Sequence, residues 1–140
     1  MTISIDSNII VALWLRGDSA NGVAATMLNQ ARRRGRLVIS GPVYAELMGD
    51  PSRTETGLDE FLNDTGISVD WTLDEFAWRE AGKAYRGYTQ RRRKSGGNSP
   101  RRILTDFLIG AQAVVRRYAL LTFDQRLYAA AFPALEIMSN

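Results

Sequence analysis

The sequence predicts an α/β domain in which helices surround a mostly parallel sheet of four to five strands. Two observations indicate this class: short apolar runs such as LVI and ALL recur along the chain, and longer amphipathic segments separate them. The 140 residues, 45% of them hydrophobic, suffice for one hydrophobic core. We therefore expect a single domain over residues 1–140.

The first half of the chain predicts two strands and three helices. Residues 2–5 contain alternating apolar side chains and predict a strand, and the apolar run IIVALWL that follows predicts a helix. Ser19 is a suitable N-cap for a second helix, which ends at three arginines and Gly35. The buried strand LVI comes next, and Pro42 fits the first turn of a helix that continues to Met48.

The middle of the chain is more polar. Residues 58–62 predict a surface helix, and residues 67–69 predict a short strand. We expect a longer helix from about Leu73 to Gln90. The low-complexity stretch RRRKSGGNSP, at residues 91–100, predicts a loop.

The last part of the chain returns to apolar segments. Residues 103–115 predict a strongly apolar helix, and residues 119–121 predict a buried strand. A helix at residues 125–130 and an edge strand at residues 135–138 complete the expected order. Strands that alternate with helices in this way are typical of a parallel sheet.

The absence of two residue types limits the chemistry. Because the chain has no cysteine, it has no disulfide, no thiolate nucleophile and no cysteine-ligated metal. Because it has no histidine, it has no Ser-His-Asp triad and no imidazole ligand. An enzyme of this composition must use carboxylates, hydroxyls, Lys or Arg, or a metal held by oxygen atoms.

The net charge of +3 is unevenly distributed. Residues 50–80 contain nine acids and two bases, whereas residues 81–102 contain eight bases and no acid. The basic stretch predicts either an anion-binding surface or a solvated loop. No apolar run approaches the roughly 18 residues of a transmembrane helix, and the N-terminus does not resemble a signal peptide. We therefore expect a cytoplasmic protein that does not enter a membrane.

Four acids outside the acidic segment occupy notable positions. Asp6 ends the first strand and Asp124 follows the strand ALLTF, so both would project from the carboxyl edge of a parallel sheet, where ligands bind. Glu46 lies in the helix after the second strand, and Asp106 lies near the start of the helix at residues 103–115. These four side chains are therefore able to converge in one cleft.

Each of these acids also has an ordinary structural interpretation. Asp6 and Asp124 are suitable helix N-caps, and Glu46 is equally acceptable as an exposed helix residue. Asp106 shares a helical stripe with Arg102 and Arg116, which is typical of a solvated face. Taken singly, none of the four is diagnostic.

The set of four predicts more than its members do. Carboxylates brought together repel one another and raise each other's pKa unless a cation neutralises them. Mg²⁺ or Mn²⁺ suits such an all-oxygen site. The metal polarises a phosphoryl oxygen and activates water as a nucleophile. A phosphodiester substrate would also account for the basic stretch.

Four motifs in the chain resemble a known family. The segments IDSNIIVALWL, GPVYAELMG, ILTDFLIGAQA and ALLTFDQRLYAAAFPALEI are similar, in order and spacing, to PIN-domain ribonucleases of the VapC toxin type. The resemblance implies a three-layer α/β/α fold and Mg²⁺- or Mn²⁺-dependent endonucleolytic cleavage of RNA. It also implies a VapB-type antitoxin as partner, and a homodimer.

The resemblance assigns roles to individual residues. Asp6 and Glu46 match the first two acids of the family pattern, Asp106 the acid before the fourth strand, and Asp124 the last acid. Thr122 matches the hydroxyl residue two positions before that last acid. The resemblance implies that the four acids bind the metal, with Glu46 either a ligand or the group that orients a metal-bound water.

The basic stretch is a candidate RNA-binding segment. Its expected RNA contacts are Arg91, Arg92, Arg93, Lys94, Arg101 and Arg102. Such contacts to phosphates are sensitive to salt and largely independent of base sequence. Two other interpretations remain open: a solvated loop, or a segment that docks on the acidic surface of a second copy or an antitoxin.

Two other functions remain as alternatives. One is a phosphatase or phosphotransferase with an aspartyl nucleophile, for which Asp6-Ser7-Asn8 would replace a DxD-like motif. Such enzymes generally use a lysine near the phosphate, and only Lys83 and Lys94 are present. The other alternative is a PIN module that binds nucleic acid or a partner without catalysis.

Overall fold

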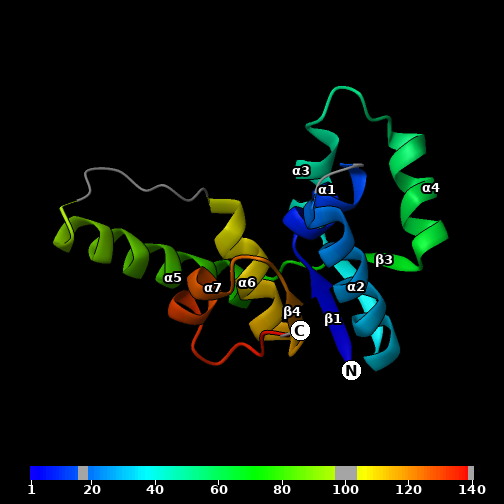
Figure 1. Cartoon of the computed structure of the whole chain (residues 1–140). Helices are drawn as coiled ribbons and strands as arrows, with labels where there is room; N and C mark the ends of the chain where they lie inside the picture. Colours follow the sequence, from blue (N-terminus) through cyan, green and yellow to red (C-terminus); the bar gives the residue numbers. More distant parts are fainter. Residues whose placement is uncertain (16–18, 97–103, 139–140) are drawn as a thin grey trace.

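The computed structural model describes residues 1–15, 19–96 and 104–138 (Figure 1). The strands are β1 (Thr2–Ile5), β2 (Arg36–Ser40), β3 (Ile67–Asp70) and β4 (Ala119–Leu121). The helices are α1 (Ser7–Trp14), α2 (Ser19–Arg34), α3 (Gly41–Met48), α4 (Glu55–Thr65), α5 (Glu75–Lys94), α6 (Leu104–Arg116) and α7 (Gln125–Ala131).

The strands form one parallel sheet in the order β3-β2-β1-β4. In this register Ile3 lies between Leu37 of β2 and Ala119 of β4, while Ser40 of β2 pairs with Asp70 of β3. The predicted parallel sheet is therefore confirmed. Its central strand, β1, joins an early segment of the chain to a late one.

Helices cover both faces of the sheet. Figure 1 shows α5, α6 and α7 grouped on one side of the strands, with α1, α2 and α4 on the other. The buried core includes Ile3 and Ile5 of β1, Ile39 of β2 and Ile109 of α6. The three-layer α/β/α arrangement implied by the resemblance is confirmed. No helix in the described ranges has both the length and the apolar character needed to cross a membrane.

The predicted loop at residues 91–100 is wrong for its first four residues. Arg91 to Lys94 form the last turn of α5, and Ser95 caps the helix. Arg and Lys have high helix propensity, and their charges are favourable at a helix C-terminus. The helix has ended by Gly96, whose positive φ of 86° suits glycine. Residues 97–103 lie outside the described ranges.

The predicted edge strand at residues 135–138 is reduced to one bridge. Ile137 pairs in parallel with Leu120. The Leu120 amide donates to the Glu136 carbonyl, and the Met138 amide donates to the Leu120 carbonyl, each at 2.9 Å. Because β4 has only three residues, it offers this segment a ladder of minimal length.

A glycine allows α6 and α7 to pack closely. A Cβ atom at Gly110 of α6 would lie 2.3 Å from Cε2 of Phe132, the residue that follows α7. Both positions are buried. The contact fixes α7 against α6 and therefore helps to place the segment around Asp124.

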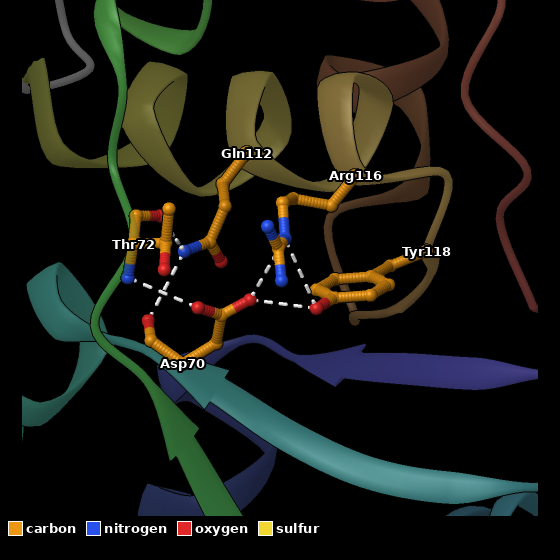
Figure 2. Close-up of polar contacts among 5 residues, drawn as sticks. All are labelled: Asp70, Thr72, Gln112, Arg116 and Tyr118. Carbon is orange, nitrogen blue, oxygen red and sulfur yellow. Dashed lines mark hydrogen bonds and ion pairs between the residues drawn. The ribbon is translucent and has the colours of Figure 1, made fainter.

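A buried polar network fixes the end of β3 beneath α6 (Figure 2). The Asp70 carboxylate accepts hydrogen bonds from the Tyr118 hydroxyl at 2.6 Å and the Thr72 amide at 3.0 Å, and it pairs with Arg116 at 3.1 Å. Gln112 donates to the carbonyls of Asp70 and Thr72. Arg116 is exposed, as predicted for a solvated stripe, and it also forms an ion pair with the buried Asp70.

Candidate functional site

Asp6 is a buried carboxylate at the carboxyl end of β1, with 3% of its surface exposed. Its amide donates to the Leu121 carbonyl at 2.9 Å, which extends the pairing of β1 with β4. Its Oδ2 accepts from the Thr122 hydroxyl at 2.7 Å, and its Oδ1 lies 3.5 Å from the Ser7 hydroxyl. Asp6 occupies the N-cap position of α1, but its side chain makes no capping hydrogen bond. Capping therefore does not explain this residue.

Thr122 connects the ends of β1 and β4. Its side chain is fully buried, and its hydroxyl donates to Asp6 while accepting from the Asp124 amide at 2.9 Å. The Asn8 side chain lies 3.5 Å from the same hydroxyl oxygen. Asp124 is at the N-cap position of α7 without a side-chain capping bond. Thr122 thus orients Asp6 and fixes the backbone that carries Asp124.

Glu46 reaches the same region from α3. Pro42 and the fully buried Ser40, whose hydroxyl accepts from the Val43 amide, start this helix directly after β2. The Ser7 hydroxyl donates to Oε1 of Glu46 at 3.3 Å. Ser7 therefore lies between the carboxylates of Glu46 and Asp6, although no role was assigned to it from the family pattern.

The four predicted acids influence one another electrostatically. Burial raises the pKa of Asp6, and the charge of Asp124 raises it further. Burial also raises the pKa of Glu46, followed by the charges of Asp106 and Asp6. Asp106 lies half-buried in the first turn of α6. The structure therefore brings carboxylates from four chain segments close enough for their charges to disfavour the ionisation of Asp6 and Glu46.

Tyr128 is a site residue that sequence reasoning missed. It is buried in α7, and its hydroxyl lacks a partner at hydrogen-bonding geometry. It is still near enough to Asp6 for its proton to favour the ionised carboxylate. Burial and the charge of Asp6 hold the pKa of Tyr128 far above its usual range. The sequence feature that could have identified Tyr128 is its position one helical turn after Asp124. A buried tyrosine, however, usually indicates core packing.

The chemistry of this donor set fits a hard divalent cation. Every donor is an oxygen atom, neighbouring acids raise the pKa of Asp6 and of Glu46, and the buried Tyr128 hydroxyl beside them lacks a hydrogen-bond partner. Among the described residues, no three acids lie close enough together to form a complete metal site by themselves. Mg²⁺ usually keeps several waters and binds through one or two carboxylates, so it does not require such a group. A positive ion here would relieve the repulsion between Asp6 and Glu46.

The basic residues lie on a different surface. Arg91 to Lys94 belong to the end of α5, whereas Arg101 and Arg102 lie outside the described residues. A cavity of about 280 Å³ separates this end of α5 from α7. Arg126, which was not predicted as a site residue, also lines it.

Structural comparison first defines the class of fold. VapBC2 from Rickettsia felis, bound to a promoter DNA fragment, has a TM-score of 0.67 and 18% identity, with 99% of this chain and 98% of that chain covered. VapBC-1 from nontypeable Haemophilus influenzae has a TM-score of 0.67, 20% identity and the same coverage. FitAcB from Neisseria gonorrhoeae has a TM-score of 0.60 and 19% identity, with 98% and 96% covered. At these identities the similarity shows a shared fold.

The family follows from the sequence. The PIN domain pattern matches residues 3–133, and the chain belongs to the PIN domain family. The match includes Asp6, Glu46, Asp106 and Asp124 within its range. A search of the curated proteins found no match to this chain.

Proposed function

We propose that this protein is a Mg²⁺- or Mn²⁺-dependent endoribonuclease that acts as a VapC-type toxin. The observation that carries the proposal is the buried Asp6 carboxylate, oriented by Thr122 and electrostatically coupled to Glu46 and Asp124. PIN domains are generally nucleases. Further support comes from structural neighbours that are toxin–antitoxin complexes.

The chain's own residues have distinct roles in this proposal. Asp6, Glu46, Asp106 and Asp124 would hold the ion, some directly and the others through its bound waters, and the ion would supply charge stabilisation and acidify bound water. Thr122 occupies Oδ2 of Asp6, which leaves Oδ1 directed toward Ser7 and Glu46. A half-buried carboxylate with a raised pKa is suited to accept a proton from attacking water, and Glu46 has these properties.

The direct test is cleavage of mixed cellular RNA with Mg²⁺, with Mn²⁺ and with a chelator. We expect cleavage with either metal, and at least a hundredfold loss in Asp6→Asn, since general acid–base and metal contributions are of this size. Asp64→Asn is the matched control because Asp64 is an exposed acid on α4. Equal cleavage by wild type and Asp6→Asn, or none by wild type with metal, would contradict the proposal.

The same samples test the alternative phosphatase. Asp6 is poorly placed as a nucleophile because it is buried and Thr122 engages one of its two oxygens. We therefore expect no phosphate release from small phosphomonoesters. Release that is abolished by Asp6→Asn, without RNA cleavage, would favour the phosphatase over the nuclease. RNA binding without either activity would favour a non-catalytic module.

The toxin role is tested in cells. The structural neighbours include a toxin–antitoxin complex from Klebsiella pneumoniae, and we propose a VapB-type antitoxin as the partner of this chain. Expression of the wild type alone is expected to arrest growth, whereas Asp6→Asn is expected to permit it. Co-expression of a small open reading frame beside the gene should restore growth. Normal growth with wild-type protein present would argue against a toxin.

We also propose that the protein forms a homodimer. Residues 50–80 are acidic and residues 81–102 are basic, so two copies offer complementary surfaces. Light scattering after size-exclusion chromatography should give twice the chain mass of 15.6 kDa. A monomer at all accessible concentrations would contradict this assembly.

A further inference from the structure

A groove between α5 and α7 combines positive charge with an apolar floor. Its volume is about 280 Å³. Three side chains carry the charge at its rim: Arg91, Arg92 and Arg126. Ser95 also lines the groove, and three aromatic or apolar residues complete the lining and are called its floor below: Tyr88, Leu127 and Ala130. Cations beside a small apolar hollow provide for both parts of a nucleotide, its phosphate and its base.

Two of the three arginines at the rim, Arg91 and Arg126, are available to a ligand. Arg91 and Arg126 are exposed, and Arg92 is half-buried. Within the described part of the chain, neither Arg91 nor Arg126 forms an ion pair with an acid. The floor is anchored from below, because the Tyr88 ring packs on Phe107 with ring centroids 5.4 Å apart.

Helix α7 connects the groove to the carboxylate site. Asp124 precedes its first residue, and Arg126 is its second. The buried Tyr128 approaches Asp6, while Leu127 and Ala130 of the same helix line the groove. A polynucleotide strand can therefore place one phosphate at the carboxylates and its next nucleotide in the groove. Between the two it crosses the start of α7.

We propose that this groove holds one nucleotide of a single-stranded RNA next to the phosphate that is cleaved. The proposal rests on the nuclease function argued above and identifies where its substrate binds. Arg91 and Arg126 contact the phosphates, and the base lies on the floor formed by Tyr88 and its neighbours. The strand is single because only an unpaired base can leave its own stack to occupy such a floor. The volume falls just below the ~300 Å³ of small ligand pockets, which suits one nucleotide.

Binding without cleavage tests the groove separately from catalysis. The probe is a short fluorescein-labelled oligouridylate, measured by fluorescence anisotropy in a chelator at several salt concentrations. Arg91→Ala and Arg126→Ala should each weaken binding about fivefold at about 0.1 M salt and reduce the salt slope by about 0.7. Arg126→Lys should keep the wild-type slope because it keeps the charge. Arg33→Ala, an exposed arginine on α2, is the matched control.

A second variant tests the floor without a change of charge. Ala130 is exposed on α7, so Ala130→Phe should fold and fill the groove. It should weaken binding at least about fivefold, the lower end expected for losing one stacked base, with an unchanged salt slope. Thermal melts confirm that each variant is folded.

The possible results separate the explanations. Wild-type affinity in both Arg126→Ala and Ala130→Phe would overturn the proposal. The proposal would also be overturned if the variants still bind oligouridylate but no longer form the dimer or bind the antitoxin. The groove would then be a binding site for a protein partner. If these variants weaken binding but wild type cleaves no RNA with metal, the groove stands and the nuclease proposal fails.

Discussion

Ionisation of Asp6 costs the fold stability. Its carboxyl group is buried, and burial is the main reason that its pKa lies above the usual value of 3.8. Hydrogen bonding by Thr122 offsets part of this cost, while the charge of Asp124 adds to it. Strain of this electrostatic kind at one residue is typical of functional sites. The raised pKa of Asp6 therefore predicts an effect on stability as well as on activity.

We expect Asp6→Asn to stabilise the metal-free protein at neutral pH. A carboxyl group whose folded pKa is raised contributes stability below its unfolded pKa, and that contribution is lost as pH rises through the folded pKa. An uncharged amide avoids the loss, so the free energy of unfolding and the melting temperature should both rise. Thermal melts in a chelator test this expectation, with Asp64→Asn as the unaffected control. A lower melting temperature for Asp6→Asn at neutral pH would contradict it.

Thr122→Val should move the pH dependence of cleavage. Valine has nearly the same shape but cannot donate to Asp6, so the pKa of Asp6 should rise further. In the mechanism that we propose, cleavage requires ionised carboxylates. The acid limb of the pH profile should therefore shift to higher pH, and activity should partly recover in alkaline buffer. Thr122→Ser, which retains the hydroxyl, should leave the limb in place. A uniform loss of rate in Thr122→Val, without a shift, would indicate a purely structural role.

The sequence located some site residues and missed others for a physical reason. Asp6 and Asp124 could be predicted at the carboxyl edge because each follows an apolar run. The bond from Thr122 to Asp6 depends on the pairing register of β1 with β4, which no local pattern encodes. Tyr128 and Ser7 were missed because their residue types have many ordinary roles.

At the scale of elements, helix α5 shows how charge extends a helix. Glu75 lies in its first turn and Arg91 to Lys94 form its last, so both ends complement the helix dipole. Repeated arginine looked like a loop only because GGNSP follows it in the sequence. Helix propensity and the dipole together explain why the helix continues to Lys94. This extension is also what brings Arg91 and Arg92 beside α7.

The network around Asp70 should make the packing of α6 sensitive to acid. Burial raises the pKa of Asp70, but the bonds from Tyr118 and Thr72 and the charge of Arg116 together hold it below 3.8. Its stabilising contribution is therefore present above the unfolded pKa and is lost as pH falls through the lowered folded value.

Tyr118→Phe tests the role of this network. The substitution removes the 2.6 Å hydrogen bond and should cost about 1–3 kcal/mol at neutral pH. In acid below the lowered pKa of Asp70, the difference between variant and wild type should shrink. Chemical denaturation at both pH values supplies the measurement, and a difference that does not depend on pH would contradict the role of Asp70.

Gly110→Ala should separate α6 from the segment after α7. Its new Cβ atom would lie 2.3 Å from Phe132, and such overpacking in a core costs about 1–3 kcal/mol. Gly82→Ala is the matched control, since a Cβ atom there meets nothing within 4 Å. That control should gain about 0.5–1 kcal/mol from helix propensity. In a double-mutant cycle with Phe132→Leu, the stability lost by the double variant should be smaller than the sum of the losses in the two single variants.

At the scale of the whole molecule, the order of the strands in the sheet could not be predicted from the sequence. Apolar runs predict how many strands exist, but the order β3-β2-β1-β4 depends on which hydrogen-bond ladders form. The segment at residues 135–138 has the pattern of a strand, yet three residues of β4 offer it one bridge. Fold class therefore follows from patterns, whereas topology follows from pairing.

The pairing of β1 with β4 has a consequence for synthesis. Asp6 is synthesised 116 residues before its partner Thr122, and β1 is likewise synthesised long before β4, which pairs with it. A nascent chain that stops before residue 119 lacks the hydroxyl that orients Asp6 and the acid at position 124. The carboxylate site therefore cannot assemble until the ribosome has synthesised residue 124. The nuclease that we propose would therefore be inactive while residues 1–123 of its own message are being translated.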